Sequence, residues 1–264
     1  MLLTQKMLLM FSPWQLAFML FGFFALFSAG TFLMTRAIVA YGRVKTHNDV
    51  VGPILGVIGT IYAVLLAFIV IVTCENHDVT KQNIDEEIGK LASLSINADA
   101  FEQPMRLELR DAIRQYIGSI VDDEWKTLRV GESCPATAMA LRKIISVCAA
   151  YKPATRTEEI FLEQSVGRVD ELYELRRKRQ LDSSSGVDPI LWMVLILGGI
   201  ITVTVSCIFD TERKSFHIFT SLSLAIIIAA ALFTILELDY PFTGKMSISS
   251  APFQKLLVRL EAYK

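Results

Sequence analysis

The chain has 264 residues, 53% of them hydrophobic, and its 26 basic and 27 acidic residues leave a formal net charge of −1. An ordinary soluble domain is roughly 45–50% apolar, so this composition indicates a membrane protein. The near-neutral balance excludes nucleic acid as a partner, because binding to phosphates requires a basic surface. The four cysteines form no C-x-x-C pair, so we expect neither a bound metal nor a cofactor.

Charge is absent from four long stretches of the sequence, and 37 of the 53 charged residues lie between Glu75 and Asp188. Each uncharged stretch meets the about 20 residues that a helix needs to cross roughly 30 Å of hydrocarbon. Only helices and closed barrels satisfy their backbone groups in lipid, and the alternation of a barrel is absent. We therefore predict four transmembrane helices, at about residues 13–36, 52–74, 189–209 and 215–237. The first stretch is longer than a cleavable signal core of roughly 7–15 residues, which favours a membrane anchor.

These crossings divide the chain into a first transmembrane hairpin at 1–74, a helical domain at 75–188, a second hairpin at 189–240 and a tail at 241–264. With four crossings, both termini and the helical domain share one side of the membrane. That side carries more basic residues near the membrane, among them Arg176, Arg177, Lys178 and Arg179. The opposite side has Arg36, Arg43, Lys45, Arg213 and Lys214. The positive-inside rule therefore predicts a cytoplasmic domain and cytoplasmic termini.

Apolar residues in 75–188 recur every three or four positions, which is typical of helices with one buried face. The first of the four predicted helices has no breaking segment after Cys74, so it continues the second crossing as one long rod. A capping box, Thr155-x-x-Glu158, opens the fourth helix, and the run from Ser183 to Gly186 ends it. We expect the basic run at 176–179 near that end, where cations suit the helix dipole. The stripes are Ile84, Ile88, Leu91, Leu94 and Ala98; Met105, Leu109, Ile113, Tyr116 and Ile120; Leu141, Ile144, Ile145 and Cys148; and Leu162, Val166, Val169, Leu172 and Tyr173.

The second crossing carries small residues on one helical face, which permits close approach of another backbone. Tight helix packing is one interpretation of this stripe. The other is that the helix lines a central pore, with large apolar residues forming a gate that closes by dewetting. The candidates that line the pore are Gly52, Gly56, Gly59, Thr60, Ala63 and Ala67. The candidates for the gate are Ile58, Leu65, Phe68 and Ile69.

Four carboxylates follow the second and fourth crossings on the same side of the membrane: Glu75, Asp78, Glu237 and Asp239. In an oligomer they would form vestibule rings that concentrate cations or bind Ca²⁺, and otherwise each is a solvated interface residue. The acidic run at 122–124 is interpreted likewise, as an exposed helix face. The sequence contains no H-E-x-x-H, G-x-S-x-G or phosphate-binding loop motif, so we predict that the protein is not an enzyme.

Several strings between about residues 52 and 260 resemble those of the bestrophin-like membrane family of bacteria and plants. They are Gly59-Thr60-Ile-Tyr62-Ala63 followed by Glu75, Asp122-Asp123-Glu124-Trp125, Leu172-Tyr-Glu-Leu-Arg176-Arg177-Lys-Arg179, Pro189-x-x-Trp192 with Gly198, Asp239-Tyr-Pro241-Phe242-x-Gly244, and Ser250-x-Pro252-Phe253. The resemblance implies an all-α integral membrane protein with four transmembrane helices and a helical cytoplasmic domain inserted between the second and third.

Bestrophins are oligomeric ion channels whose second helix lines the pore. The resemblance therefore implies a homo-oligomer in the lipid bilayer of a bacterial inner membrane, a pentamer before a tetramer, that passes small inorganic ions. An anion such as chloride is favoured over a cation by the resemblance alone. Calcium gating does not carry over, because Glu237 and Asp239 are the only acids where animal bestrophins have a run of carboxylates. The alternative is a non-conducting, membrane-anchored signalling or scaffold protein.

Overall fold

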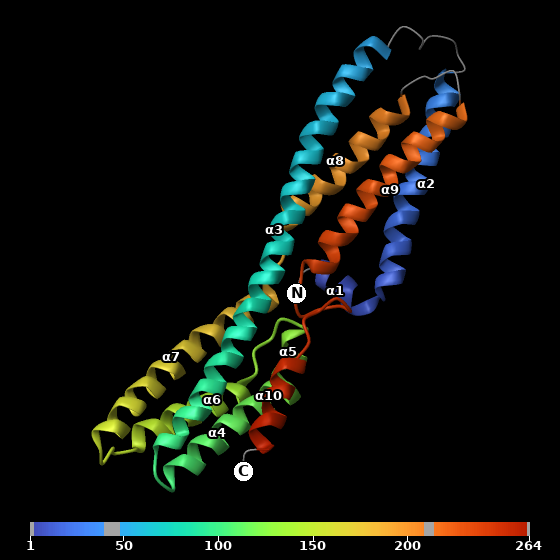
Figure 1. Ribbon diagram of the computed structural model, residues 1–264. Helices are drawn as coiled ribbons and strands as arrows, with labels where there is room; N and C mark the ends of the chain where they lie inside the picture. Colours follow the sequence, from blue (N-terminus) through green and yellow to red (C-terminus); the bar gives the residue numbers. More distant parts are fainter. Residues whose placement is uncertain (1–2, 40–47, 209–213, 263–264) are drawn as a thin grey trace. The chain divides into compact units, whose positions relative to one another are not determined.

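The computed structural model describes residues 3–39, 48–208 and 214–262, and every regular element within them is a helix (Figure 1). The chain forms two compact units. The membrane unit comprises Lys6–Asn76 and Gly186–Asp239, and the inserted unit comprises Met1–Gln5, His77–Ser185 and Tyr240–Lys264. Arg43, Lys45 and Arg213, which entered the prediction of orientation, lie outside the described residues, as does residue 209 at the expected end of the third crossing.

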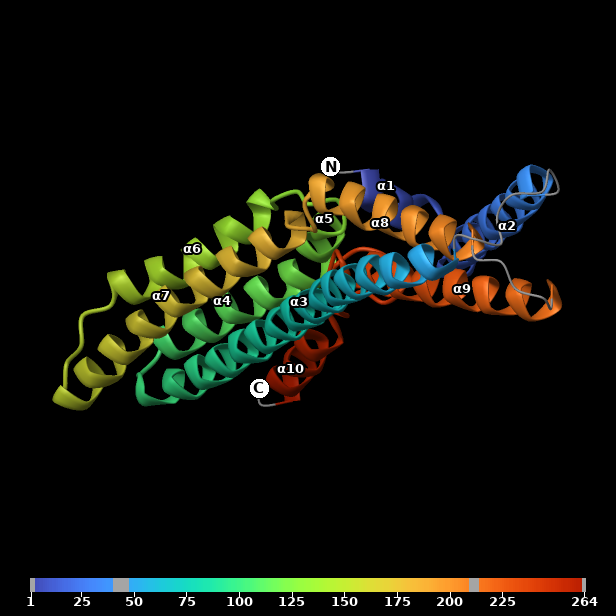
Figure 2. The ribbon, with the colours of Figure 1, turned by 90° about the horizontal axis from the view of Figure 1, so that it is seen from above.

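Among the described residues, four helices are long and apolar enough to cross a membrane, which confirms the predicted crossings. They are α2 (Pro13–Val39), the first part of α3 (Asn48–Asn97), α8 (Pro189–Ile208) and α9 (Lys214–Leu238). Helices α2, α8 and α9 contact one another in the membrane unit, as Figures 1 and 2 show. Their shared core includes Phe24, Leu195 and Leu232.

A short helix, α1 (Leu3–Met10), precedes the first crossing, and the sequence analysis did not separate the two. The break follows from reciprocal capping around Ser12. The backbone N–H of Ser12 donates to Oε1 of Gln15 at 2.8 Å, and the N–H of Gln15 donates to Oγ of Ser12 at 3.4 Å. This S-x-x-Q capping box, with Pro13 at the first helical position, starts α2.

Helix α3 is continuous over 50 residues, which confirms the predicted rod. At 1.5 Å per residue its length is about 75 Å, more than twice the thickness of the hydrocarbon core. Its first part belongs to the membrane unit and its last part, from His77, to the inserted unit. The same helix therefore carries the small-residue stripe and one wall of the inserted unit's core.

The rest of the inserted unit consists of η1 (Ala98–Ala100), α4 (Met105–Ser119), a π-helical turn η2 (Ile120–Glu124), α5 (Trp125–Leu128), α6 (Pro135–Ala150), α7 (Arg156–Ser184) and α10 (Ala251–Ala262). The four predicted stripes form its core, with Leu91, Ile113, Leu141 and Leu172 fully buried. Tyr173 departs from this pattern, because its side chain remains 36% exposed. Burial of these stripes is the main source of stability, since each large apolar side chain contributes about 1.5–3 kcal/mol.

Both ends of α7 (Arg156–Ser184) agree with the prediction. At the start, Oγ1 of Thr155 accepts from the N–H of Glu158 at 3.2 Å, and Oε2 of Glu158 accepts from the N–H of Ala154 at 2.7 Å, so the capping box is confirmed. At the other end the helix stops at Ser184, inside the run from Ser183 to Gly186 that was predicted to end it. The hydroxyls of Ser183 and Ser184 donate to carbonyl oxygens one turn back, which lets the helix run through both serines.

Helix α10 was not predicted in the tail. Phe253 and Leu256 are buried in the core of the inserted unit, and Leu257 and Leu260 pack against it. Helix α10 lies against α4. The spacing of these four residues by one, three and four positions is the helical pattern that reveals it, with Pro252 in the first turn.

Candidate functional site

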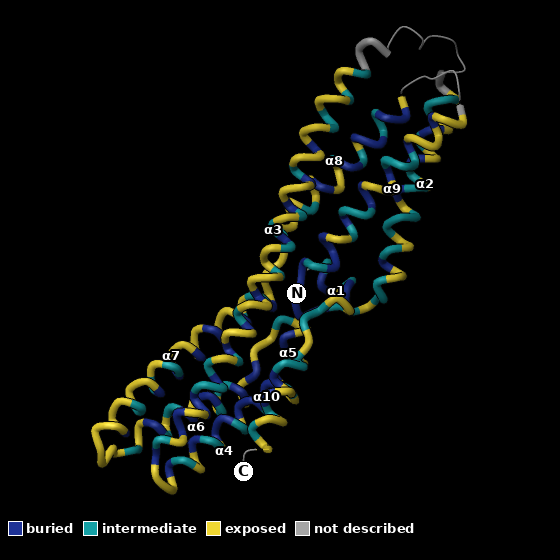
Figure 3. The backbone as a smooth tube through the Cα atoms, viewed as in Figure 1, coloured by how far each residue is buried: buried dark blue, intermediate teal, exposed yellow. Residues whose placement is uncertain are grey.

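The small-residue stripe of α3 lies on a face that the protomer does not cover. Another face packs inward through Tyr62, Leu66, Ile69 and Thr73. Gly56, Thr60, Ala63 and Ala67 are exposed, and Gly52 and Gly59 are half-buried. The yellow segments of α3 in Figure 3 follow this uncovered face. Of the most apolar 18 residues of α3, 17% are buried, against 33% in α8 and in α9.

The space beside the stripe is open within one chain. A methyl group added to Gly56 or Gly59 would meet no atom within 4 Å. The hydroxyl of Thr60 donates to the carbonyl oxygen of Gly56 at 2.7 Å, so its hydrogen bond is satisfied within the helix. The stripe therefore does not serve tight packing within the protomer.

Contacts between Tyr62 and α8 set the rotation of α3. The hydroxyl of Tyr62 donates to the carbonyl oxygen of Leu195 at 3.0 Å. The ring lies on the backbone of Gly198, where an added Cβ would be 2.5 Å from Cδ2 of the tyrosine. At Gly199 an added Cβ would be 3.0 Å from the tyrosine oxygen. Because Tyr62 faces α8, the small residues face away from it.

The four gate candidates do not share a face. Phe68 is 62% exposed and lies on an uncovered part of α3 beside the stripe, whereas Ile69 is 6% exposed and belongs to the core of the membrane unit. Ile58 and Leu65 are half-buried and border a shallow apolar pocket against α8. Phe68 is thus the gate candidate whose side chain is available to a path along the stripe.

The four acidic candidates fall into two environments. Glu75 and Asp78 are exposed on α3. Glu237 and Asp239 are each only 5% exposed, so the expectation of solvated residues fails for this pair. Asp239 accepts hydrogen bonds from the N–H of Val187 and, at 3.3 Å, from Nε1 of Trp192, so it holds the start of α8. Neither carboxylate oxygen of Glu237 has a hydrogen-bond partner among the described residues.

A buried charge cluster in the inserted unit was missed by the sequence analysis. Arg179 donates to a carboxylate oxygen of Glu87 and to one of Glu124. Arg176 donates to Glu124 at 2.8 Å and to the carbonyl oxygen of Cys134 at 3.0 Å. Glu87 and Glu124 are fully buried, and Tyr116 donates to Glu87 at 2.8 Å. Two negative and two positive charges thus compensate one another inside the core.

Two sequence interpretations change as a result. The exposed helix face expected at 122–124 is found for Asp122 and Asp123 but not for Glu124. Arg176 and Arg179 lie before the last turn of α7, and their side chains are held inside the inserted unit by ion pairs. Burial by itself lowers the pKa of Arg179, yet the carboxylates of Glu87 and Glu124 raise it above its ordinary value, so the guanidinium stays charged.

Aromatic rings, two of them from the C-terminal tail, pack beside the buried charge cluster. The ring of Trp125 lies edge-on to Phe242 and Phe253, with centroids 5.4 and 5.7 Å away. Its Nε1 donates to the carbonyl oxygen of Ile248 at 3.1 Å. The guanidinium carbon of Arg179 lies 5.4 Å from the ring centre of Phe253, a cation–π distance. The strings around residues 125, 179, 242 and 253, which are far apart in sequence, therefore meet in one structural core.

These features define a class: an all-helical integral membrane protein with four crossings and a helical unit inserted between the second and the third. Structures of a bacterial bestrophin homolog from Klebsiella pneumoniae share this fold. One that carries a single substitution aligns with a TM-score of 0.74 at 12% identity, over 93% of this chain and 99% of that chain. A second aligns with a TM-score of 0.72 at 13% identity, over 92% and 97% of the two chains. No curated protein sequence matches the chain.

The family follows from the sequence match. The model of the Bestrophin-like domain matches residues 22–253, which include most of the first crossing, the other three crossings and most of the inserted unit. The chain belongs to the Bestrophin-like family. This confirms the resemblance that the sequence strings indicated.

Proposed function

We propose that the protein is a homo-oligomeric ion channel of the bacterial inner membrane, a pentamer, whose axis is lined by the stripe of α3. The observation that carries the proposal is that Gly56, Thr60, Ala63 and Ala67 are exposed while another face of the same helix is packed. A glycine within a helix costs about 1 kcal/mol relative to alanine. A helix that carries glycine on an uncovered face accepts this cost, and the missing side chain allows close approach of another subunit or of a permeating ion.

The path that this stripe would form is apolar at its narrow part. The exposed ring of Phe68 lies beyond Ala67, and a ring of such side chains around an axis would close by dewetting. Glu75 and Asp78 follow two to three turns later along α3 and are exposed, so they are our candidates for the vestibule. Glu237 and Asp239 are not, because both are buried. Preference for an anion such as chloride rests on family membership alone.

The decisive test is conductance of the purified protein in planar bilayers, together with the mass of the complex in detergent. We expect an oligomeric mass and discrete ion currents. We also expect Gly56→Leu to abolish the currents, because a Cβ at this exposed position meets no atom of its own protomer within 4 Å, and the leucine side chain would enter the proposed axis. Gly30→Leu is the matched control, since Gly30 is also exposed in a crossing helix with open space around it.

Two outcomes would contradict the channel. A monomeric mass is incompatible with an axial path. Silence of the wild-type protein across ions, pH and Ca²⁺ would favour the alternative, a non-conducting signalling or scaffold protein in which the crossings only anchor the inserted unit.

We propose that both termini and the inserted unit are cytoplasmic. Arg176 and Arg179 form buried ion pairs, so they do not act as surface charges that support this orientation. Arg177 and Lys178 are exposed and do support it. A green fluorescent protein fused to the C-terminus is expected to fluoresce, and a periplasmic phosphatase fused there to be inactive. The same reporters fused after Arg36, beyond one crossing, are expected to give the reverse result. An active phosphatase at the C-terminus would overturn the orientation.

A further inference from the structure

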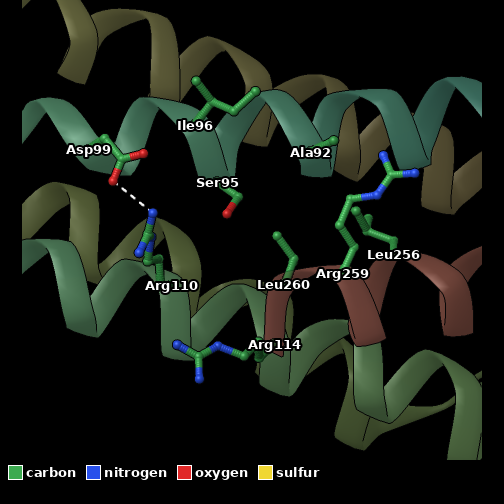
Figure 4. Close-up of a pocket in the computed structure, with 9 residues that line it drawn as sticks. All are labelled: Ala92, Ser95, Ile96, Asp99, Arg110, Arg114, Leu256, Arg259 and Leu260. Carbon is green, nitrogen blue, oxygen red and sulfur yellow. Dashed lines mark hydrogen bonds and ion pairs between the residues drawn. The ribbon is translucent and has the colours of Figure 1, made fainter. Parts of the chain in front are cut away.

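A cavity of about 340 Å³ lies in the inserted unit, between the end of α3, α4 and α10 (Figure 4). Its volume is at the lower end of the range for small-molecule sites, roughly 300–1,000 Å³. Neither the buried charge cluster nor the stripe of α3 contributes a residue to it. The proposed channel activity therefore gives this cavity no role.

The charges that line the cavity are predominantly positive. Arg110 and Arg114 come from α4 and Arg259 from α10, whereas Asp99 is the one lining carboxylate. Nη2 of Arg110 lies 2.7 Å from Oδ1 of Asp99, as the dashed line in Figure 4 marks. With all four groups ionised, the lining carries two net positive charges. A concave site with such a lining attracts a dianion more strongly than a monoanion.

Arg110 is already paired with Asp99, but the surroundings of Arg114 and Arg259 leave the positive charge of these two side chains available to a ligand. The carboxylate that pairs with Arg114 at 3.1 Å belongs to Asp111, whose side chain is 57% exposed and therefore screened by water. No ion pair of Arg259 occurs among the described residues. Guanidinium groups present planar pairs of N–H donors that match carboxylate and phosphate oxygens.

The remaining wall is mostly apolar. Ala92 of α3 and Leu256 and Leu260 of α10 line the cavity, and the hydroxyl of Ser95 points from α3 into the space between α3 and α4 in Figure 4. Inorganic phosphate would leave this aliphatic wall in contact with water. A molecule that joins an anionic group to a small apolar body would satisfy both kinds of surface.

We propose that this cavity binds a small organic dianion, a phosphate monoester or a dicarboxylate with a short apolar body. Arg110 and Arg114 hold the charged group, Arg259 adds the second favourable charge from α10, and the leucines of α10 cover the apolar part. Because α3, α4 and α10 all line the cavity, the ligand also ties α10 to the rest of the inserted unit.

Titration calorimetry of the full-length protein in detergent at low salt tests this site, with phenyl phosphate and phthalate as probes. Benzyl alcohol serves as the neutral probe and inorganic phosphate as the anion without an apolar body. We expect at least one organic dianion to bind about tenfold more tightly than either comparison probe, and Arg114→Gln/Arg259→Gln to weaken it by about tenfold or more. The matched control is Arg142→Gln/Lys255→Gln, which removes two exposed positive charges outside the cavity lining.

The possible results of this titration either support or overturn the proposed site. Loss of binding in the cavity variant with an unchanged control supports the site. Equal weakening in both double variants would show attraction by overall charge and would overturn it. Binding of both organic dianions no tighter than that of inorganic phosphate, or no binding of either organic dianion, would also overturn it. The measurement involves no ion current, so it stands or fails independently of the channel proposal.

Discussion

Replacing Glu124 with glutamine is expected to destabilise the inserted unit by about 3–5 kcal/mol, because breaking a buried ion pair by removal of one partner leaves an uncompensated charge in the core. Glu124 is fully buried and accepts from both Arg176 and Arg179. Glutamine keeps the shape of the side chain but cannot neutralise two guanidiniums. Hydrogen exchange of peptides from α6 and α7, measured along a urea series in detergent, reports the stability of this unit separately from the crossings.

The neighbouring residue supplies the control for this experiment. Asp123→Asn makes the same change of charge one position earlier, but Asp123 is exposed and outside the cluster. Surface substitutions of this kind usually change stability by no more than about 0.5 kcal/mol. Similar exchange in the two variants would show that the cluster contributes nothing beyond local charge, contrary to our account.

The sequence carries a signal for this buried charge cluster, because its charged residues occupy core positions of the helical patterns. Glu124 lies four residues after Ile120 of a predicted stripe, and Leu128 follows after four more, so the carboxylate occupies a core position of that pattern. Glu87 stands likewise between Ile84 and Leu91, and Arg176 four residues after Leu172. Charged residues of both signs at core positions of neighbouring helices predict buried pairing. Which acid meets which arginine depends on how the helices pack, which periodicity does not specify.

The crossings and the long rod follow from local signals, but the use of the α3 stripe does not. Small residues at helical spacing are compatible with packing inside the protomer and with an uncovered face. The contact between Tyr62 and Gly198, which lies more than a hundred residues later in the sequence, decides between these two arrangements, because it turns the stripe away from α8. A contact between distant segments of this kind has no periodic signature. Helix α10 in the tail differs from this case, because its apolar residues do show helical spacing in the sequence, although over a short segment.

Gly198→Ala is expected to destabilise the membrane unit by about 1–3 kcal/mol through overpacking. The added Cβ would lie 2.5 Å from Cδ2 and 2.7 Å from Cε2 of Tyr62. That ring is 6% exposed and is held by its hydrogen bond to Leu195, so it cannot move aside without shifting α3. The midpoint of thermal unfolding in detergent measures the effect. In the proposed channel the same shift moves the pore-lining face, so conductance should fall as well.

A second substitution identifies the clash as the cause. Tyr62→Phe keeps the ring, so it should not relieve Gly198→Ala, whereas Tyr62→Leu removes the clashing ring edge and should recover part of the lost stability in the double variant. Gly30→Ala is the control, because no atom lies within 4 Å of the added methyl group and alanine is the better helix former. If Gly198→Ala proved as stable as Gly30→Ala, the contact between Tyr62 and α8 could not be what orients the stripe of α3.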